Sequence, residues 1–460
     1  METISYFKNI VNSTDAKAIS LLLVFELLLL IVYIVMDYIP VLVIIGCVLS
    51  IPIFIIYFEN TVLLLFTMIF SILAGSIGEV KFGGKIPQIL FVDLFFPVFF
   101  VIFIFKSLFD TNQKRKFHVV ATILSLFLLW GLLSFFTAID KLRMLLIWKS
   151  YFYGLIFFLF TYWFVKTPKE LRSTLVAFIL FGIVLAFIEF FIVINLGGLT
   201  QGLVGLFLRK NLLATSWGKS NYLATFYVLI IPITIGYFLV IKPIRFKLLI
   251  AIAILIMFSA LILTLSRGGI LALGIALVFL LSRVLRPKTF VPILFTVVLV
   301  AIILLLNPLT SVLFERLATV ESSFSYMTRV NFYKDVWQMF LDNPIIGVGI
   351  GNLGYHSTFI IVAQSSAHNI ILGLLGETGI PGAMLFVSLL VYIFIYITKN
   401  FLKEVNYSRK ILIWSFLSSL VGVYVHSLLE PNFEGFQFSI LFWTAIGMFI
   451  KFDELHLDFD

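Results

Sequence analysis

A polar cluster that could carry out acid–base chemistry stands at the edge of a long apolar run. Ser366, His368 and Asn369 lie within four positions of one another, directly before that run. Polar side chains at the mouth of a hydrophobic helix are costly without partners, and a neutral imidazole is well suited to accept a hydroxyl proton near pH 7. A lone histidine at a helix end is more often structural, but the polar residues beside His368 favour a catalytic base. We therefore expect His368 to be catalytic, supported by Asn369 and by Glu377 further along the segment.

A second candidate, Arg267, lies between two long apolar runs in the sequence Leu-Ser-Arg-Gly-Gly. A guanidinium there is expensive unless it is paired or faces water, and a phosphate or carboxylate would bind it by bidentate hydrogen bonds. The glycines allow close backbone approach at the start of the next helix, whose amino end also favours an anion. Ser266 would support this turn. An arginine reaching for lipid headgroups is the alternative, and the residues alone leave both open.

Two further cations are candidates for the same anion. Arg329 opens an expected loop helix, although an ordinary solvated charge would look the same. Arg209 belongs to a basic cluster with Lys210 and Lys219. This cluster indicates an anionic ligand, and lipid headgroups would serve equally well.

The composition restricts the class of protein that could hold these residues. The chain has 460 residues, of which 62% are hydrophobic and 12% are charged, and its mean hydropathy is +1.16. These values are typical of a polytopic membrane protein. The single cysteine, Cys47, excludes an intramolecular disulfide and a cysteine metal site. The net charge of +9 is spread over short loops, so no basic face for nucleic acid is expected.

Apolar runs of about 17–25 residues, long enough to span a bilayer, recur along the chain. They predict an all-α integral membrane protein with about 14 transmembrane helices, in a range of 12–14. The predicted spans are 19–36, 40–57, 61–77, 89–106, 118–137, 146–165, 172–194, 221–241, 246–265, 269–285, 289–306, 370–397, 410–429 and 436–451. The chain then divides into N-terminal transmembrane helices (1–306), a long loop (307–367) and C-terminal transmembrane helices with a short tail (368–460).

The basic residues predict the orientation of these spans. Most of the 32 Lys and Arg residues fall in the short loops on one side, which is the cytoplasmic side by the positive-inside rule. Both termini are then cytoplasmic, and the loop 307–367 lies outside. In that loop Phe332, Tyr333, Val336, Trp337 and Phe340 recur at mostly helical spacing, and Pro344 ends the pattern. We expect a small amphipathic helical cap on the outer membrane surface.

Three motifs together resemble the bacterial O-antigen ligase and O-antigen polymerase superfamily. The first is Leu-Ser-Arg-Gly-Gly-Ile-Leu-Ala-Leu at 265–273, and the second runs from Arg329 through Trp337 to the Pro-x-x-Gly-x-Gly-x-Gly-Asn turn at 344–352. The third is the His-Asn…Glu-x-Gly helix that starts at His368. The resemblance covers about 218–448; the first 200 residues match only as hydrophobic spans.

The resemblance implies a membrane glycosyltransferase of the bacterial cytoplasmic membrane, needing neither metal nor nucleotide cofactor. Such an enzyme moves a glycan from an undecaprenyl diphosphate donor to a glycan or glycolipid acceptor, with inversion at the sugar. The family's catalytic histidine corresponds to His368, and its diphosphate-binding arginines to Arg267, Arg329 and Arg209. Arg209 stands further from the Asn221-Tyr-Leu-Ala stretch than the family pattern has it, and Lys219 intervenes. No nucleic acid is implied, and membrane lipid surrounds the site.

Two alternatives remain at this point. A repeat-unit polymerase of the same superfamily would use the same donor and differ only in its acceptor. A flippase or transporter of lipid-linked oligosaccharides belongs to another class, and transporters often show internal repeats and matched broken helices. This sequence shows no fixed-period repeat and no convincing similarity between its halves, so neither feature favours a transporter.

The first testable prediction concerns topology. In a Cys47→Ser background, single cysteines introduced at 320–360 should react with an impermeant thiol reagent on intact cells. Cysteines at 399–410 should react only after the membrane is opened, because the basic residues place that loop in the cytoplasm. Protection throughout 320–360 would contradict the orientation.

Overall fold

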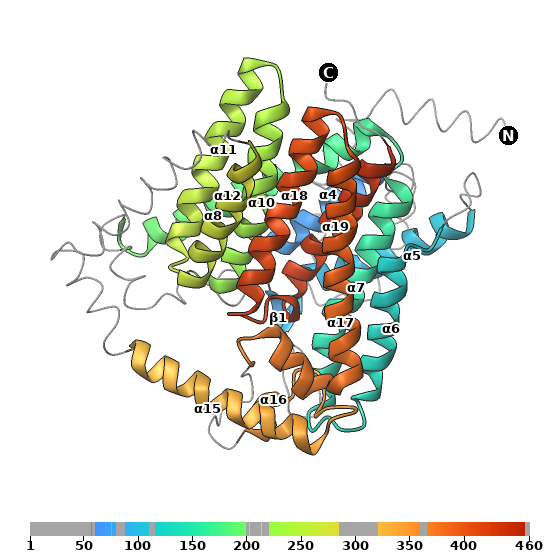
Figure 1. The fold of residues 1–460 in the computed structure, drawn as a ribbon, viewed down its shortest axis with the longest axis vertical. Coiled ribbons are helices and arrows are strands. Elements are labelled where there is room, and N and C mark those ends of the chain that lie inside the picture. Colours follow the sequence, from blue (N-terminus) through green and yellow to red (C-terminus); the bar gives the residue numbers. More distant parts are fainter. Residues whose placement is uncertain are drawn as a thin grey trace, which may run out of the picture.

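A computed structural model describes residues 57, 60–74, 76–79, 88–109, 116–198, 202, 213, 220–284, 321–357 and 366–455. Its main body is a bundle of long helices, and one further helix lies across an end of that bundle (Figure 1). The predicted spans 19–36 and 289–306, and all but the last residue of 40–57, lie outside the described residues. So does Arg209.

The bundle consists of long helices whose positions follow the apolar runs of the sequence. They are α5 (Phe91–Phe109), α6 (Val119–Leu133), α7 (Lys141–Phe164), α8 (Pro168–Asn195), α10 (Ser220–Val240), α11 (Ile244–Leu263), α12 (Arg267–Val284), α17 (Ile370–Lys403), α18 (Tyr407–Ser427) and α19 (Phe436–Glu454). Seven of the described helices, namely α7, α8, α10, α11, α12, α17 and α18, are long and apolar enough to cross a membrane. The predicted helical bundle is therefore confirmed for the described part of the chain, and its long apolar helices are consistent with a membrane protein.

The segment before α5 departs from the all-helical prediction. The span expected over 61–77 is the shorter α4 (Thr61–Ser71), which continues as the 3-10 turn η1 (Ile72–Ala74). The strands β1 (Ser76–Glu79) and β2 (Gln88–Leu90) then pair antiparallel. Pairing satisfies backbone groups that a helix would otherwise satisfy internally, which hydropathy alone does not reveal.

Side-chain caps fix where several helices begin. Asn369 Oδ1 accepts hydrogen bonds from the N–H groups of Ile371 and Leu372, both at 3.0 Å, and so begins α17. Thr167 and Glu170 form a reciprocal capping box at the start of α8. These contacts satisfy N–H groups that have no partner inside a helix.

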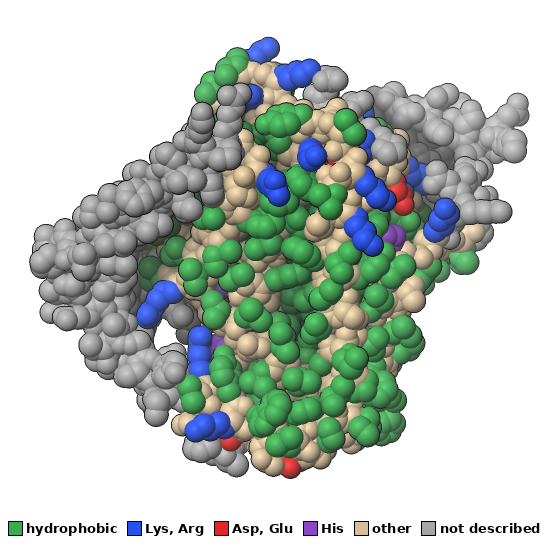
Figure 2. All heavy atoms as spheres, in the orientation of Figure 1, with side chains coloured by type: hydrophobic (Ala, Val, Ile, Leu, Met, Phe, Trp, Pro, Cys, Tyr) green, Lys and Arg blue, Asp and Glu red, His purple; other side chains and the backbone are tan. Residues whose placement is uncertain are grey.

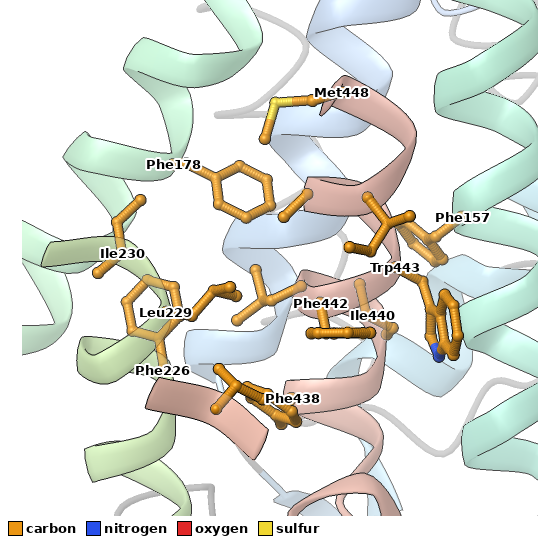
Figure 3. Packing of buried hydrophobic residues seen from close by; sticks show 14 of the residues in the cluster. Phe157, Phe178, Phe226, Leu229, Ile230, Phe438, Ile440, Phe442, Trp443 and Met448 are labelled. Atoms are coloured by element: carbon orange, nitrogen blue, oxygen red, sulfur yellow. The ribbon is translucent and has the colours of Figure 1, made fainter. Parts of the chain in front are cut away.

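The centre of the hydrophobic core lies around α19. Figure 3 shows α19 side chains between those of α7 on one side and those of α8 and α10 on the other. The labelled residues include Phe157, Phe178, Phe226, Leu229, Phe438, Phe442 and Trp443. α7 approaches so closely that a Cβ added to Gly154 would lie 2.1 Å from Trp443 Cδ1. α18 packs against α10 and α12, which brings the starts of those helices to the end of α18.

The helix across the end of the bundle is α15 (Glu321–Asp342), followed by the short α16 (Leu353–His356) (Figure 1). Phe332, Val336 and Met339 are buried in a second, smaller hydrophobic cluster between α15 and the start of α17. The sequence placed Trp337 on the same apolar face. Its side chain is instead 50% exposed and lies against Phe340, with ring centroids 5.2 Å apart.

The surface carries its charges toward the ends of the bundle. In Figure 2, Lys and Arg side chains gather toward the upper end and again near α15, and the surface between them is largely hydrophobic. Inside the bundle, Asp93 of α5 pairs with Lys149 of α7 at 2.8 Å and accepts a hydrogen bond from Tyr153. Glu189 of α8 accepts one from Tyr227 at 2.7 Å. These acids link neighbouring helices, as expected for structural pairs.

The contact between α7 and α19 predicts a stability effect. Gly154→Ala should destabilise the protein by about 1–3 kcal/mol, because its Cβ would overlap the buried Trp443 ring. Gly274→Ala is the matched control, since no described atom lies within 4 Å of an added Cβ there. Alanine at that position should be neutral or stabilise α12 by up to about 1 kcal/mol. Thermal unfolding of both variants in detergent measures the difference, and equal melting temperatures would contradict the packing.

Candidate active site

The carboxylate of Glu430 joins side chains from three other parts of the chain at one end of the bundle. Glu430 follows α18, and its side chain is only 4% exposed. Oε2 lies 2.9 Å from His368 Nδ1, and Oε1 lies 3.3 Å from an Arg329 nitrogen. Asn221 Nδ2, at the start of α10, donates to Oε1 at 2.5 Å. His368, the expected base, and Arg329, one of the expected cations, therefore both contact the carboxylate of Glu430.

His368 is held in place on both sides of its backbone. Its φ of 47° lies in the left-handed region, where histidine is more frequent than most residues other than glycine. Asn369 caps α17 immediately after it and donates from Nδ2 to the carbonyl of Leu428 at 3.3 Å. Tyr333 donates from its hydroxyl to the His368 carbonyl at 3.3 Å. The imidazole remains 30% exposed, so a substrate can reach it.

α15 supplies two of these contacts from one face. Arg329 and Tyr333 are one helical turn apart, so their side chains leave the helix in the same direction. Arg329 reaches Glu430, and Tyr333 reaches the backbone of His368. The small cluster around Phe332 and Val336 holds α15 against the bundle and thereby places both side chains.

The electrostatics keep Glu430 ionised. Burial alone raises the pKa of Glu430, but the hydrogen bond from His368 and the positive charge of Arg329 lower it. The net effect is a pKa below the ordinary value for glutamate. A carboxylate in this state is a strong hydrogen-bond acceptor for the histidine ring.

A second histidine, His426, is buried one helical turn before Glu430. Its Nδ1 lies 2.8 Å from Thr225 Oγ1 and 3.2 Å from Asn432 Nδ2. An amide nitrogen can only donate, so we assign the hydrogen of the neutral ring to Nε2. Nε2 is buried and makes no hydrogen bond with the described residues. A Cβ added to Gly268 would lie 3.5 Å from it, so His426 stands beside the start of α12.

Arg267 is the first residue of α12 and is exposed at the same end of the bundle. Ser266 Oγ accepts a hydrogen bond from the N–H of Gly269 at 3.2 Å and so supports the first turn. The following Gly268 lies against His426 and Leu429, immediately before Glu430. The fold thus brings the start of α12 beside the group that holds His368.

Glu377 lies elsewhere, at a break in α17. It accepts a hydrogen bond from the N–H of Gly351 at 2.9 Å, and it lies nine residues after His368, about 14 Å away by helical rise. The break is at Gly379, with φ of 68°, and Gly347 has φ of 75°. A Cβ on Gly347 would lie 2.3 Å from the backbone of Glu377, so only glycine permits this approach.

The Gly-x-Gly-x-Gly-Asn turn is therefore a structural anchor. The N–H groups of Val348 and Gly349 donate to carbonyls of α17 at 2.8 and 3.0 Å. Asn352 is fully buried and bonds to the backbone of Asp140, at the start of α7, through both ends of its amide. The turn ties the loop that carries α15 to two helices of the bundle.

The structure brings some of the residues expected from the sequence together and leaves others apart. His368, Arg329 and Asn369 come together, Arg267 and Ser266 lie beside them, and Glu377 does not join them. Sequence reasoning missed Glu430, Asn221 and Tyr333. A buried acid one turn after His426, at the end of a predicted span on the same side as His368, was the available signal. Among the described residues, no three His, Cys, Asp or Glu side chains gather closely enough to hold a metal ion.

Comparison with protein families tests the resemblance of the motifs. Residues 252–387 match the O-antigen ligase family model, Wzy_C. This segment contains Arg267, Arg329 and His368, and the family resemblance is confirmed for it. Glu430 lies outside the matched segment. No curated protein matches the chain. The match to the O-antigen ligase family and the apolar helices together suggest a multi-pass protein of a bacterial inner membrane.

The Glu430 contacts predict a pH-dependent stability. Because the folded pKa is lowered, ionised Glu430 stabilises the fold above its ordinary pKa, and this contribution is lost as the pH falls through the folded pKa. Glu430→Gln should therefore destabilise the protein at pH 7 by about 1–2 kcal/mol. The difference from the unchanged protein should shrink when thermal unfolding is measured below about pH 4.

Asp342→Asn is a suitable control for that experiment, because Asp342 is exposed and, among the residues that the structure describes, bonds only to Gln338 on its own helix. Its effect should stay within about 0.5 kcal/mol. A Glu430→Gln protein as stable as the unchanged protein at pH 7 would show that the carboxylate contacts do not hold this end together.

Proposed function

We propose that the protein is a membrane glycosyltransferase that moves a glycan from undecaprenyl diphosphate to a hydroxyl of a glycan or glycolipid acceptor. The observation that carries the proposal is the cluster of His368, Glu430 and Arg329, with Arg267 at the start of the neighbouring α12. It combines a partly exposed base with cations at the end of a membrane helix bundle. The O-antigen ligase match of residues 252–387 supports the same class of reaction.

His368 serves as the base in this scheme. Its Nδ1–H donates to Glu430 at 2.9 Å, which leaves the lone pair of Nε2 available to accept a proton. The acceptor hydroxyl oxygen attacks the anomeric carbon of the donor glycan, and its proton passes to Nε2. The bond between that carbon and the diphosphate oxygen breaks, and its electron pair leaves on the diphosphate. Attack from the face opposite the leaving group inverts the anomeric centre.

Cations receive the negative charge that develops on the leaving diphosphate. A guanidinium has five N–H donors, and the described contact of Arg329 with Glu430 uses one nitrogen at 3.3 Å. Arg267 adds a second guanidinium beside the amino end of α12, where backbone N–H groups favour an anion. We keep Arg209 as a third candidate. The scheme uses neither a metal nor a nucleotide.

The proposed site faces the outside of the cytoplasmic membrane. In this arrangement the chain crosses the membrane about 14 times, and both termini are cytoplasmic. α15 lies across the outer end as the cap, with its exposed Trp337 at the membrane interface, where tryptophan is common. The polyprenyl chain of the donor stays in lipid beside the bundle. Ligase and polymerase activity share this donor and differ in the acceptor.

The proposal is tested by transfer from a purified undecaprenyl diphosphate glycan to lipid or glycan acceptors, without added metal. His368→Gln and His368→Asn should lower the rate about 10²–10⁴-fold, because neither amide can accept a proton near neutrality. Donor affinity should survive both changes. Arg267→Ala should instead lose donor binding, and Arg267→Lys should restore only part of it, because a point charge does not replace a bidentate clamp.

The His368→Asn variant is the matched control for His368→Gln, because asparagine tolerates the left-handed backbone of position 368. Full activity of either variant would show that His368 is not the base. Lost donor affinity in both would place His368 in the diphosphate site. The acceptor that is extended distinguishes the two activities: a growing polymer indicates a polymerase, and a membrane glycolipid indicates a ligase.

A further inference from the structure

A large groove opens at the other end of the bundle, between α8, α10 and α11. Its volume is about 620 Å³, within the range of about 300–1,000 Å³ that small-molecule sites occupy. α10 has 21 residues and is therefore about 32 Å long. It begins next to Asn221 in the Glu430 cluster and ends beside the groove. The groove and the candidate active site therefore belong to opposite membrane surfaces.

The walls of the groove are almost entirely apolar. α8 contributes residues at helical spacing from Arg172 to Ile183, and α11 does so from Phe246 to Ala253. The stretch of α8 along the groove is about 16 Å long by helical rise. The hydrocarbon core of a bilayer is about 30 Å thick, so the groove extends through roughly one leaflet. Its length and lining therefore suit an acyl chain.

The mouth of the groove carries two cations. Arg172 lies on the first turns of α8, and Lys242 lies in the turn between α10 and α11. Both are exposed, and both line the groove. In the orientation of Figures 1 and 2 the α10–α11 turn lies at the end of the bundle away from α15, where Lys and Arg side chains gather. Cations above an apolar groove complement a phosphate that carries acyl chains.

We propose that this groove binds an anionic phospholipid of the leaflet opposite the candidate active site. Its phosphate lies between Arg172 and Lys242, and an acyl chain lies along α8 and α11. The buried Tyr237 of α10 forms the floor near the mouth. This site is separate from the proposed donor site and does not depend on the proposed function.

Native mass spectrometry of the full-length protein in detergent tests the proposal. Titration with phosphatidylglycerol and with phosphatidylcholine of identical acyl chains should show tighter binding of the anionic lipid. Arg172→Ala and Lys242→Ala should each weaken phosphatidylglycerol binding about 5-fold, and the double variant about 25-fold. Phosphatidylcholine binding should change little. Equal binding of both lipids by the unchanged protein would overturn the proposal even if the variants failed to fold.

The matched control is the double variant Arg245→Ala and Lys247→Ala, which removes the same charge from α11 without touching the lining. It should bind phosphatidylglycerol nearly normally, and an equal loss would reduce the effect to general surface charge. Ile183→Trp keeps both cations and fills the deep end, so it should weaken the binding of the long-chain lipid. Unchanged binding there would contradict the acyl-chain path.

Two competitors identify the source of the phosphate. Inorganic phosphate at millimolar concentration should not displace phosphatidylglycerol, because it lacks the chain. Undecaprenyl phosphate should compete weakly. Displacement by inorganic phosphate, or tighter binding of undecaprenyl phosphate than of phosphatidylglycerol, would overturn the assignment to a phospholipid.

Discussion

A carboxylate buried at the end of a membrane helix bundle has to be balanced by its surroundings, and Glu430 imposes this constraint on the candidate site. Its two oxygens take contacts from His368, Arg329 and Asn221. Each partner comes from a different part of the chain, so the charge can be satisfied only when α10, α15 and the start of α17 are all in place. Removing one partner would leave a buried charge that is costly without the others.

Arg329 can reach Glu430 only if the loop that carries α15 is attached to the bundle. α17 is broken at Gly379, and the carbonyls near the break accept N–H groups from the 347–351 turn. The break that weakens the helix therefore creates the docking point for the loop. Asn352 ties the same turn to the start of α7. The start of α17, which follows His368, and the break at Gly379 are thus parts of the same helix.

Hydropathy predicted most of the described fold, because a lipid environment leaves a helix as the simplest way to satisfy backbone groups. It failed where backbone groups are satisfied in another way, as in the β1–β2 pair. Motifs placed His368, Arg267 and Arg329 at one end of the bundle. They could not reveal Glu430, whose importance comes from partners distant in sequence. Periodicity likewise assigned Trp337 to the buried face of α15, although Phe332, Val336 and Met339 form that face and Trp337 is exposed.

The backbone of His368 has a consequence for the variety that homologous chains can show. Its left-handed φ disfavours β-branched and most bulky residues, while the proposed proton transfer needs a second ring nitrogen beside the one that contacts Glu430. Asparagine and glycine meet the first demand and fail the second. A homologue that lacked the proposed chemistry but kept the architecture would therefore be expected to carry one of these two residues at this position. Such an exchange would serve as a recognisable mark of a non-catalytic member, in the way that altered nucleophiles mark pseudoenzymes elsewhere.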